Sequence, residues 1–162
     1  MSAGRGISVG EPALFAGVSN QGNGRLYESM VAAKLSRFFD YAGADVDRAE
    51  ELYHDDAVLE FPQSGERFEG RAAFTQWRAA YPVSRDDLRY RIRRTTIRGD
   101  FSVVELSASY DRGESWVYGL QLLDWRGEKV ARERIYVMDG WDPPAWRAGW
   151  RSPTPADPDA EE

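Results

Sequence analysis

The sequence predicts an α+β domain, in which helices pack against a long, curved antiparallel sheet. In the first half of the chain, apolar side chains recur at spacings of three and four residues, which is typical of helices. In the second half the spacing changes to two, in four stretches that short turns separate, which predicts a meander of strands. A strongly curved sheet wrapped on a few helices forms a cone, and its open mouth suits a small molecule.

Composition favours one domain and excludes several kinds of site. The chain has 162 residues, no cysteine and one histidine, His54. Disulfides, thiolate metal sites and cysteine nucleophiles are therefore excluded, and we expect neither a metal nor a cofactor. The net charge of −6 argues against nucleic-acid binding. No apolar run approaches the ~20 residues of a membrane span, and the chain starts without a signal-peptide core, so we expect a cytoplasmic protein.

The ends of the chain differ from its centre. Residues 1–24 hold six glycines without a sustained apolar period, and we expect a flexible arm there. Residues 152–162 are rich in proline and acid, which predicts a disordered tail. A single domain is expected over residues 25–151.

Three helices are expected before the long strands. The apolar face of the first comprises Tyr27, Val31, Leu35, Phe38 and Ala42, and Gly43 ends it. Asp45 or Asp47 can cap a short second helix, whose inner side comprises Val46, Ala49, Leu52 and Tyr53. The third begins after Gly70, carries Phe74, Trp77 and Tyr81, and ends at Pro82.

The strands follow from alternation and from turn residues. A short strand is predicted over 58–61, stopped by Pro62, and a smaller piece around Arg67 and Phe68. Four long strands are expected over 89–98, 101–110, 114–125 and 129–139, because Gly-containing turns separate them. Proline in a first turn predicts a short C-terminal helix over 143–150.

Several segments, in this order, resemble the nuclear-transport-factor-2-like (cystatin-like) superfamily and its SnoaL-like branch, over residues 26–150. They are LYHDDAVLEFP, FEGRAAFTQWRAAYP, VVELSASYDRGE and RGEKVARERIYVMD. The resemblance implies a cone-shaped sheet around a deep apolar pocket, and a homodimer. It also implies chemistry of the isomerase, polyketide cyclase, lyase or hydrolase type, or binding without chemistry.

Two known catalytic patterns of this superfamily are incomplete in the chain. Steroid isomerases carry a carboxylate immediately before the proline that ends the first strand, where this chain has Phe61. Epoxide hydrolases carry an acid before the tyrosine of the last strand, where this chain has Ile135. SnoaL-type cyclases use an acid inside the pocket, and acids do remain on the predicted inner strands.

Glu133 is the first candidate for catalysis. Alternation places it with Ala131, Ile135 and Val137 on the more apolar face of the last long strand. A carboxylate in an apolar pocket has a raised pKa, which suits a general acid or base near neutral pH. The alternative is that Glu133 pairs with an arginine across the sheet.

Glu105 and Glu60 are the candidate partners of Glu133. If Glu105 faces inward with Val103, it can form a facing acid pair with Glu133; if it faces outward, it is a solvated residue bridging to an arginine. Glu60 stands two residues before Pro62, where hydrolases of the superfamily hold a water. Its alternative is to point away while Phe61 fills the cavity floor.

Aromatic side chains are expected to shape the pocket and to bind the substrate. The candidates are Phe61, Trp77, Trp116 and Tyr118, together with Ile135 and with Tyr53, whose hydroxyl can donate a hydrogen bond. Packing in the core is the alternative for each ring. Trp141, Trp146 and Trp150 are expected to anchor the C-terminal segment or a dimer contact. His54 is expected at a corner between a helix and a strand, where polar residues satisfy the terminal carbonyl groups; this structural role is favoured over a proton relay.

Three functions follow from these patterns. The first is an enzyme that moves protons on a hydrophobic, oxygenated small molecule without a cofactor, such as a polyketide-like intermediate of secondary metabolism. The second is a binding or assembly module without catalysis, and the third is a dimerisation domain whose cone is filled by its own side chains. The arginines of residues 85–98 alternate with apolar residues, which favours a solvated face or dimer interface over nucleic acid.

Overall fold

A computed structural model describes residues 20–42 and 45–152 of the protein. Two helices come first, α1 (Asn20–Ala42) and α2 (Val46–Glu50), followed by strands β1 (Tyr53–Phe61) and β2 (Glu66–Glu69) and by helix α3 (Arg71–Ala79). A 3-10 turn (Arg85–Asp87) leads to the long strands β3 (Arg89–Arg98), β4 (Phe101–Ser109), β5 (Val117–Arg126) and β6 (Lys129–Met138). The α+β class is thereby confirmed, with the third helix placed after the first two strands.

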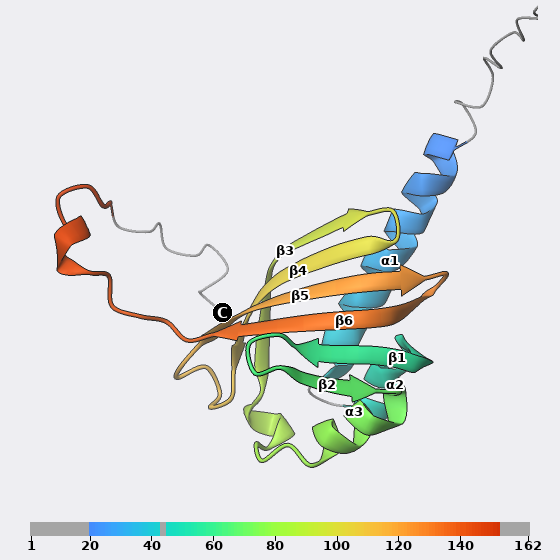
Figure 1. The fold of residues 1–162 in the computed structure, drawn as a ribbon, viewed down its shortest axis with the longest axis horizontal. Coiled ribbons are helices and arrows are strands. Elements are labelled where there is room, and N and C mark those ends of the chain that lie inside the picture. Colours follow the sequence, from blue (N-terminus) through green and yellow to red (C-terminus); the bar gives the residue numbers. More distant parts are fainter. Residues whose placement is uncertain (1–19, 43–44, 153–162) are drawn as a thin grey trace, which may run out of the picture.

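The six strands form one mixed sheet in the order β2-β1-β6-β5-β4-β3. The meander from β3 to β6 is antiparallel, as predicted, whereas β1 runs parallel to β6. Register shifts interrupt the β3–β4, β5–β6 and β1–β6 ladders, and such bulges bend strands and increase their twist. The sheet therefore curves without closing, with the helices on one face (Figure 1).

The core lies between α1, α3 and the concave, inner face of the sheet. Val31, Leu35 and Phe38 are the buried stripe of α1, at the spacing expected from the sequence. They pack with Tyr53 and Phe74 and with buried residues of the sheet: Leu59, Val104, Leu123, Trp125 and Val130. The sheet and helices thus enclose one continuous core, which positions the candidate site at its open end.

Three boundaries differ from the expectation. Helix α1 begins at Asn20, inside the segment assigned to the arm, and Leu26 in its second turn is exposed. Helix α2 ends at Glu50, with Asp45 as its cap, so Tyr53 begins a strand. His54 also lies on β1, where its Nε2 hydrogen-bonds the carbonyl of Arg126 at 2.7 Å, a structural role. Residues 1–19 and 153–162 lie outside the described part.

The segment after β6 extends away from the sheet (Figure 1). Its helix is shorter than predicted, a 3-10 turn over Ala145–Arg147. Trp141, Trp146 and Trp150 are 76%, 69% and 84% exposed, so within the described residues they do not anchor the segment to the body. No helix within the described ranges has both the length and the apolar character needed to cross a membrane.

Candidate active site

A cavity of about 310 Å³ lies between the helices and the inner face of the sheet. Its volume is at the lower end of the range for small-molecule sites. Aromatic residues dominate the lining: Phe38, Phe61, Trp77, Tyr81, Tyr90 and Tyr110. Among the aliphatic lining residues are Val46, Leu106, Ile135 and Val137. Its volume contradicts the third alternative, a cone filled by its own side chains.

One charged pair breaks this apolar lining. Glu50, at the end of α2, and Arg78, on α3, both border the cavity, and Arg78 donates a hydrogen bond to Glu50 Oε1. Glu50 is 3% exposed and the Arg78 side chain 17%, so the carboxylate is almost entirely removed from water while the guanidinium keeps some access to it. A carboxylate in such a place requires a cation or a proton, and Arg78 supplies the cation.

Glu133 lies immediately behind Arg78. It is fully buried on β6, and its Oε2 accepts a hydrogen bond of 2.5 Å from the Tyr53 hydroxyl. The same oxygen lies 3.5 Å from Arg78 Nη2, which is also 3.5 Å from the Tyr53 hydroxyl. The four side chains of Glu50, Arg78, Tyr53 and Glu133 thus form one polar cluster, which we call the inner cluster.

Burial sets the electrostatics of the inner cluster. Desolvation raises the pKa of Glu133, against the opposing effects of Arg78 and of the hydrogen bond from Tyr53. Desolvation also raises the pKa of Glu50, again opposed by Arg78. Burial and the charge of Glu133 raise the pKa of Tyr53 well above its usual value. Both carboxyl groups therefore titrate closer to neutral pH than in water, as acid–base catalysts require.

Three buried acceptor oxygens have no hydrogen-bond partner among the described residues. They are Glu50 Oε2, Glu133 Oε1 and Gln121 Oε1. Glu50 and Gln121 are also lining residues of the cavity, so two of these unpartnered oxygens belong to side chains of its wall. Most buried polar atoms in folded proteins are satisfied, so unpartnered acceptors on side chains of a cavity wall are an exception that a bound donor would remove.

The inner face of β6 matches the expectation from alternation. Glu133 is buried on the side of the sheet that carries Ile135 and Val137, which both line the cavity. Phe61 and Trp77 also line it, at 5.6 Å between ring centroids. Glu133 and Tyr53 themselves are not among the lining residues, whereas Arg78, which contacts Glu133, is one of them. The acid that borders the cavity is Glu50.

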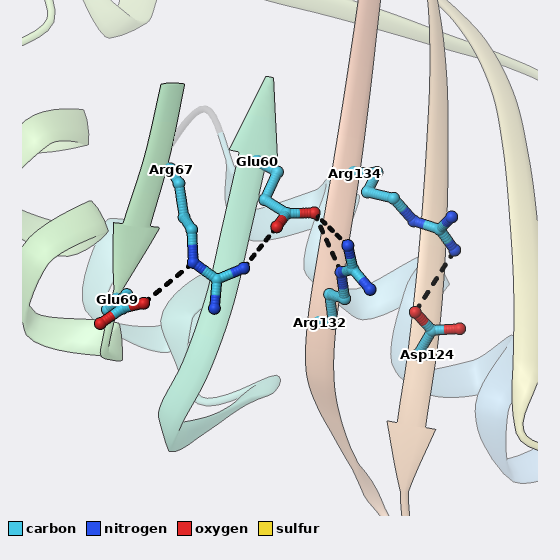
Figure 2. Close-up of polar contacts among 6 residues, drawn as sticks. All are labelled: Glu60, Arg67, Glu69, Asp124, Arg132 and Arg134. Carbon is cyan, nitrogen blue, oxygen red and sulfur yellow. Dashed lines mark hydrogen bonds and ion pairs between the residues drawn. The ribbon is translucent and has the colours of Figure 1, made fainter. Parts of the chain in front are cut away.

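Glu60 and Glu105 lie on the opposite, outer face of the sheet, and their predicted place beside Glu133 is wrong. Glu60 accepts hydrogen bonds from Arg67 on β2 and Arg132 on β6, in the row of charged side chains that Figure 2 shows. Arg132 in particular holds the pKa of Glu60 below its usual range. Glu105 is exposed, because its neighbours Val104 and Leu106 take the buried positions of β4.

Trp116 differs from the expectation, and Tyr118 matches it in part. Trp116 precedes β5 and is not a lining residue; its ring packs under Arg91, with 3.9 Å between guanidinium and ring centre. Tyr118 borders the cavity, but its side chain is 42% exposed and Arg93 lies over its ring. The inner face of β5 is the one that carries Gln121, which lines the cavity.

Glu50, Arg78 and Gln121 were not predicted as site residues. Two of them lie on helical stripes that the sequence does show. Arg78 follows Phe74 by four residues, and Glu50 follows Val46 by four, so each shares a face with a buried residue. A charged residue at such a position is the signal that could have located the inner cluster.

The sequence of the chain matches a known domain family. The sequence model of the SnoaL-like domain matches residues 35–133, more than half of the chain. The protein belongs to the SnoaL-like domain family. The matched range holds all four residues of the inner cluster, while no curated protein matches the chain.

Solved structures show the same fold. An NTF-2-like protein of unknown function from Burkholderia xenovorans LB400 is 28% identical, covering 80% of this chain and 98% of that chain, with a TM-score of 0.71. A protein of Kribbella flavida provisionally assigned as a ketosteroid isomerase is 23% identical, over 80% and 93% of the two chains, with a TM-score of 0.69. An LEH-like epoxide hydrolase of M. tuberculosis is 16% identical, over 67% and 83%, with a TM-score of 0.56. This SnoaL-like chain therefore shares its fold with proteins of several activities.

Proposed function

We propose that the cavity carries out cofactor-independent acid–base chemistry on a hydrophobic, oxygenated small molecule, with Glu50 as the group that exchanges the proton. The observation that carries the proposal is a nearly buried carboxylate at the cavity wall with one oxygen held by Arg78 and the other free. A cyclisation, isomerisation, dehydration or hydrolysis each needs such a group. An intermediate of polyketide or other secondary metabolism is a substrate of suitable character.

The inner cluster assigns a different role to each of its members. Glu50 Oε2 takes a proton from the bound molecule and returns it at another atom, while Oε1 stays on Arg78. Glu133 does not reach the cavity; it is a positioning residue that holds Arg78 and Tyr53. Burial raises the pKa of Glu50 against the opposing effect of Arg78, which makes its ionised form a stronger base.

The proposal is tested with 5-nitrobenzisoxazole, a neutral apolar probe whose ring opens when a base removes its C–H proton. We expect the protein to accelerate this reaction and Glu50→Gln to lose about a hundredfold in kcat/KM, the usual contribution of a positioned base. The exposed Glu105→Gln is the matched control and should retain the wild-type rate. Full activity in Glu50→Gln would contradict the assignment.

Glu133→Gln separates a positioning role from direct proton transfer. With Glu133 neutral, Arg78 is shared no longer and the pKa of Glu50 falls, so the rising limb of the pH–rate profile should move to lower pH. If Glu133 itself removes the proton, the variant instead loses activity at every pH. The direction of this shift therefore decides between the two carboxylates.

A second candidate function is small-molecule binding without catalysis. Phe61 and Ile135 occupy the places where the two catalytic patterns of related enzymes carry acids, and both line the cavity. In this case the probe would bind without accelerated ring opening, and Glu50→Gln would change its affinity alone.

We also propose that the protein assembles as a homodimer through the outer face of its sheet. Support comes from the absence of covering helices among the described residues on that face, and from the half-buried side chains Leu120, Leu122 and Tyr136 at its centre. We expect sedimentation to give twice the 18.4 kDa of the chain, and Leu122→Lys to give the monomer. A monomeric wild type at micromolar concentration would contradict the proposal.

A further inference from the structure

The charges around the cavity do not balance. Glu50 and Arg78 are the charged side chains that line it, and Glu133 contacts Arg78 from behind. Two carboxylates thus share one guanidinium in a region from which water is largely excluded. When both are ionised, the inner cluster carries a net charge of −1, and a further positive charge would stabilise it.

The hydrogen bonds show a matching excess of acceptors over donors. Arg78 donates toward Glu50, and its other terminal nitrogen lies near Glu133 and Tyr53. Glu50 Oε2 and Gln121 Oε1, both at the cavity, are left without a donor. The unpartnered buried groups at the polar end of the cavity are therefore acceptors, and a ligand that matches them brings donors.

Aromatic rings supply the rest of the environment that a cation needs. The guanidinium carbon of Arg78 lies between 5.4 and 5.9 Å from the ring centres of Phe38, Tyr53, Phe74 and Trp77. Cations are attracted to the faces of such rings at this distance. The row of rings continues along the cavity, from Trp77 to Tyr81 at 5.8 Å and from Tyr81 to Tyr110 at 5.7 Å.

We propose that the cavity binds an apolar molecule carrying a protonated amine, with the ammonium N–H directed to Glu50 Oε2 and the adjoining carbons against Trp77, Tyr81 and Tyr110. Ionised Glu50 then has a charge-assisted hydrogen bond at each oxygen, one from Arg78 and one from the ligand. The inference concerns the same cavity as the proposed chemistry but requires no turnover.

Ligands of other charge fit less well. A carboxylate or a carbonyl directed at this wall would place an acceptor against Glu50 Oε2, which repels it. A neutral hydroxyl can donate to Glu50 but leaves the second carboxylate of the inner cluster without a counter-charge. The amine satisfies both the hydrogen bond and the charge.

Two probes of nearly equal shape test the inference. N,N-dimethylbenzylammonium carries the cation, and isobutylbenzene is its neutral carbon analogue. We expect calorimetry or displacement of an apolar dye to show the amine binding at least about tenfold more tightly, given the strengths of charge-assisted hydrogen bonds and cation–π contacts. Equal affinities, or no binding of the amine at millimolar concentration, would overturn the inference.

Glu50→Gln and Glu105→Gln then locate the preference for the amine. The first should reduce the affinity ratio of the two probes to about one, because the charge at the wall is lost, while the second should leave it unchanged. An undiminished ratio in a folded Glu50→Gln would overturn the site. If Glu50→Gln fails to fold, the wild-type ratio alone still decides. Neither result depends on ring opening of 5-nitrobenzisoxazole, so loss of the proposed catalysis and loss of this inference are distinguishable.

Discussion

The two faces of the sheet hold the same chemical groups in opposite electrostatic states. On the outer face, Glu60 pairs with two arginines, of which Arg67 also pairs with Glu69, and it stays partly open to water, with a lowered pKa. On the inner face, Glu50 and Glu133 share Arg78 in near-complete burial, and both pKa values are raised. The comparison shows that the ratio of cations to carboxylates and the access of water decide whether such a group is structural or chemically poised.

Removing one arginine from each face should give the largest difference. Arg78→Met leaves two buried carboxylates without a counter-ion, and we expect a loss of about 3–5 kcal/mol in the free energy of unfolding. Arg132→Met breaks an exposed pair and should cost about 1 kcal/mol or less. Urea unfolding monitored by circular dichroism measures both, and similar losses would remove the distinction between the faces.

Removing one hydroxyl should give a smaller effect. Tyr53→Phe deletes the donor to buried Glu133 and should lower the free energy of unfolding by about 1–3 kcal/mol. Tyr27→Phe is the matched control, because its hydroxyl donates to the Gly127 carbonyl near the surface, where water can replace it. If the control is as costly as Tyr53→Phe, burial is not what makes the inner hydrogen bond important.

The smallest expected effect is on the pH dependence of stability, which should have opposite signs for Glu133 on the inner face and Glu60 on the outer face. Because the folded-state pKa of Glu133 is raised, its contribution is complete below the pKa of the unfolded chain and is lost as pH rises through the folded value. The folded-state pKa of Glu60 is lowered, so its contribution is present at neutral pH and is lost as pH falls.

Urea unfolding across a series of pH values compares each variant with the wild type. Glu133→Gln should gain stability relative to the wild type as pH rises, whereas Glu60→Gln should gain as pH falls. Equal slopes for the two variants would show that the two carboxylates experience similar surroundings.

The helices and strands could be predicted because their sequence patterns are local. The site could not, because it depends on contacts between distant segments. Alternation along β6 was enough to place Glu133 on the inner face. The parallel contact of β1 with β6 leaves no trace in either strand's own sequence, so the sheet was predicted as wholly antiparallel. On β4, Ser107 and Ser109 are buried although they alternate with apolar residues, so both faces carry similar side chains and alternation left the face of Glu105 open.

Glu50 and Arg78 show why charged residues of a buried site are difficult to recognise. Each ends or follows a short apolar stripe and would ordinarily be assigned to a solvated helix face. Their burial depends on each other, since the two residues are 28 positions apart in the chain and meet only in the folded protein. A single sequence does not indicate which distant residues will be in contact.

The three exposed tryptophans after β6 affect the fluorescence of the protein. Half of the six indoles of the chain lie in water in the folded monomer, and their emission stays at long wavelength whether the body is folded or not. Changes in fluorescence on unfolding or on ligand entry therefore come from Trp77, Trp116 and Trp125. A ligand in the cavity changes the emission of Trp77, while the long-wavelength emission of the three exposed tryptophans stays constant. A partner that covers the C-terminal segment would instead shift the emission of those three to shorter wavelength. Two kinds of association are thus separable in one spectrum.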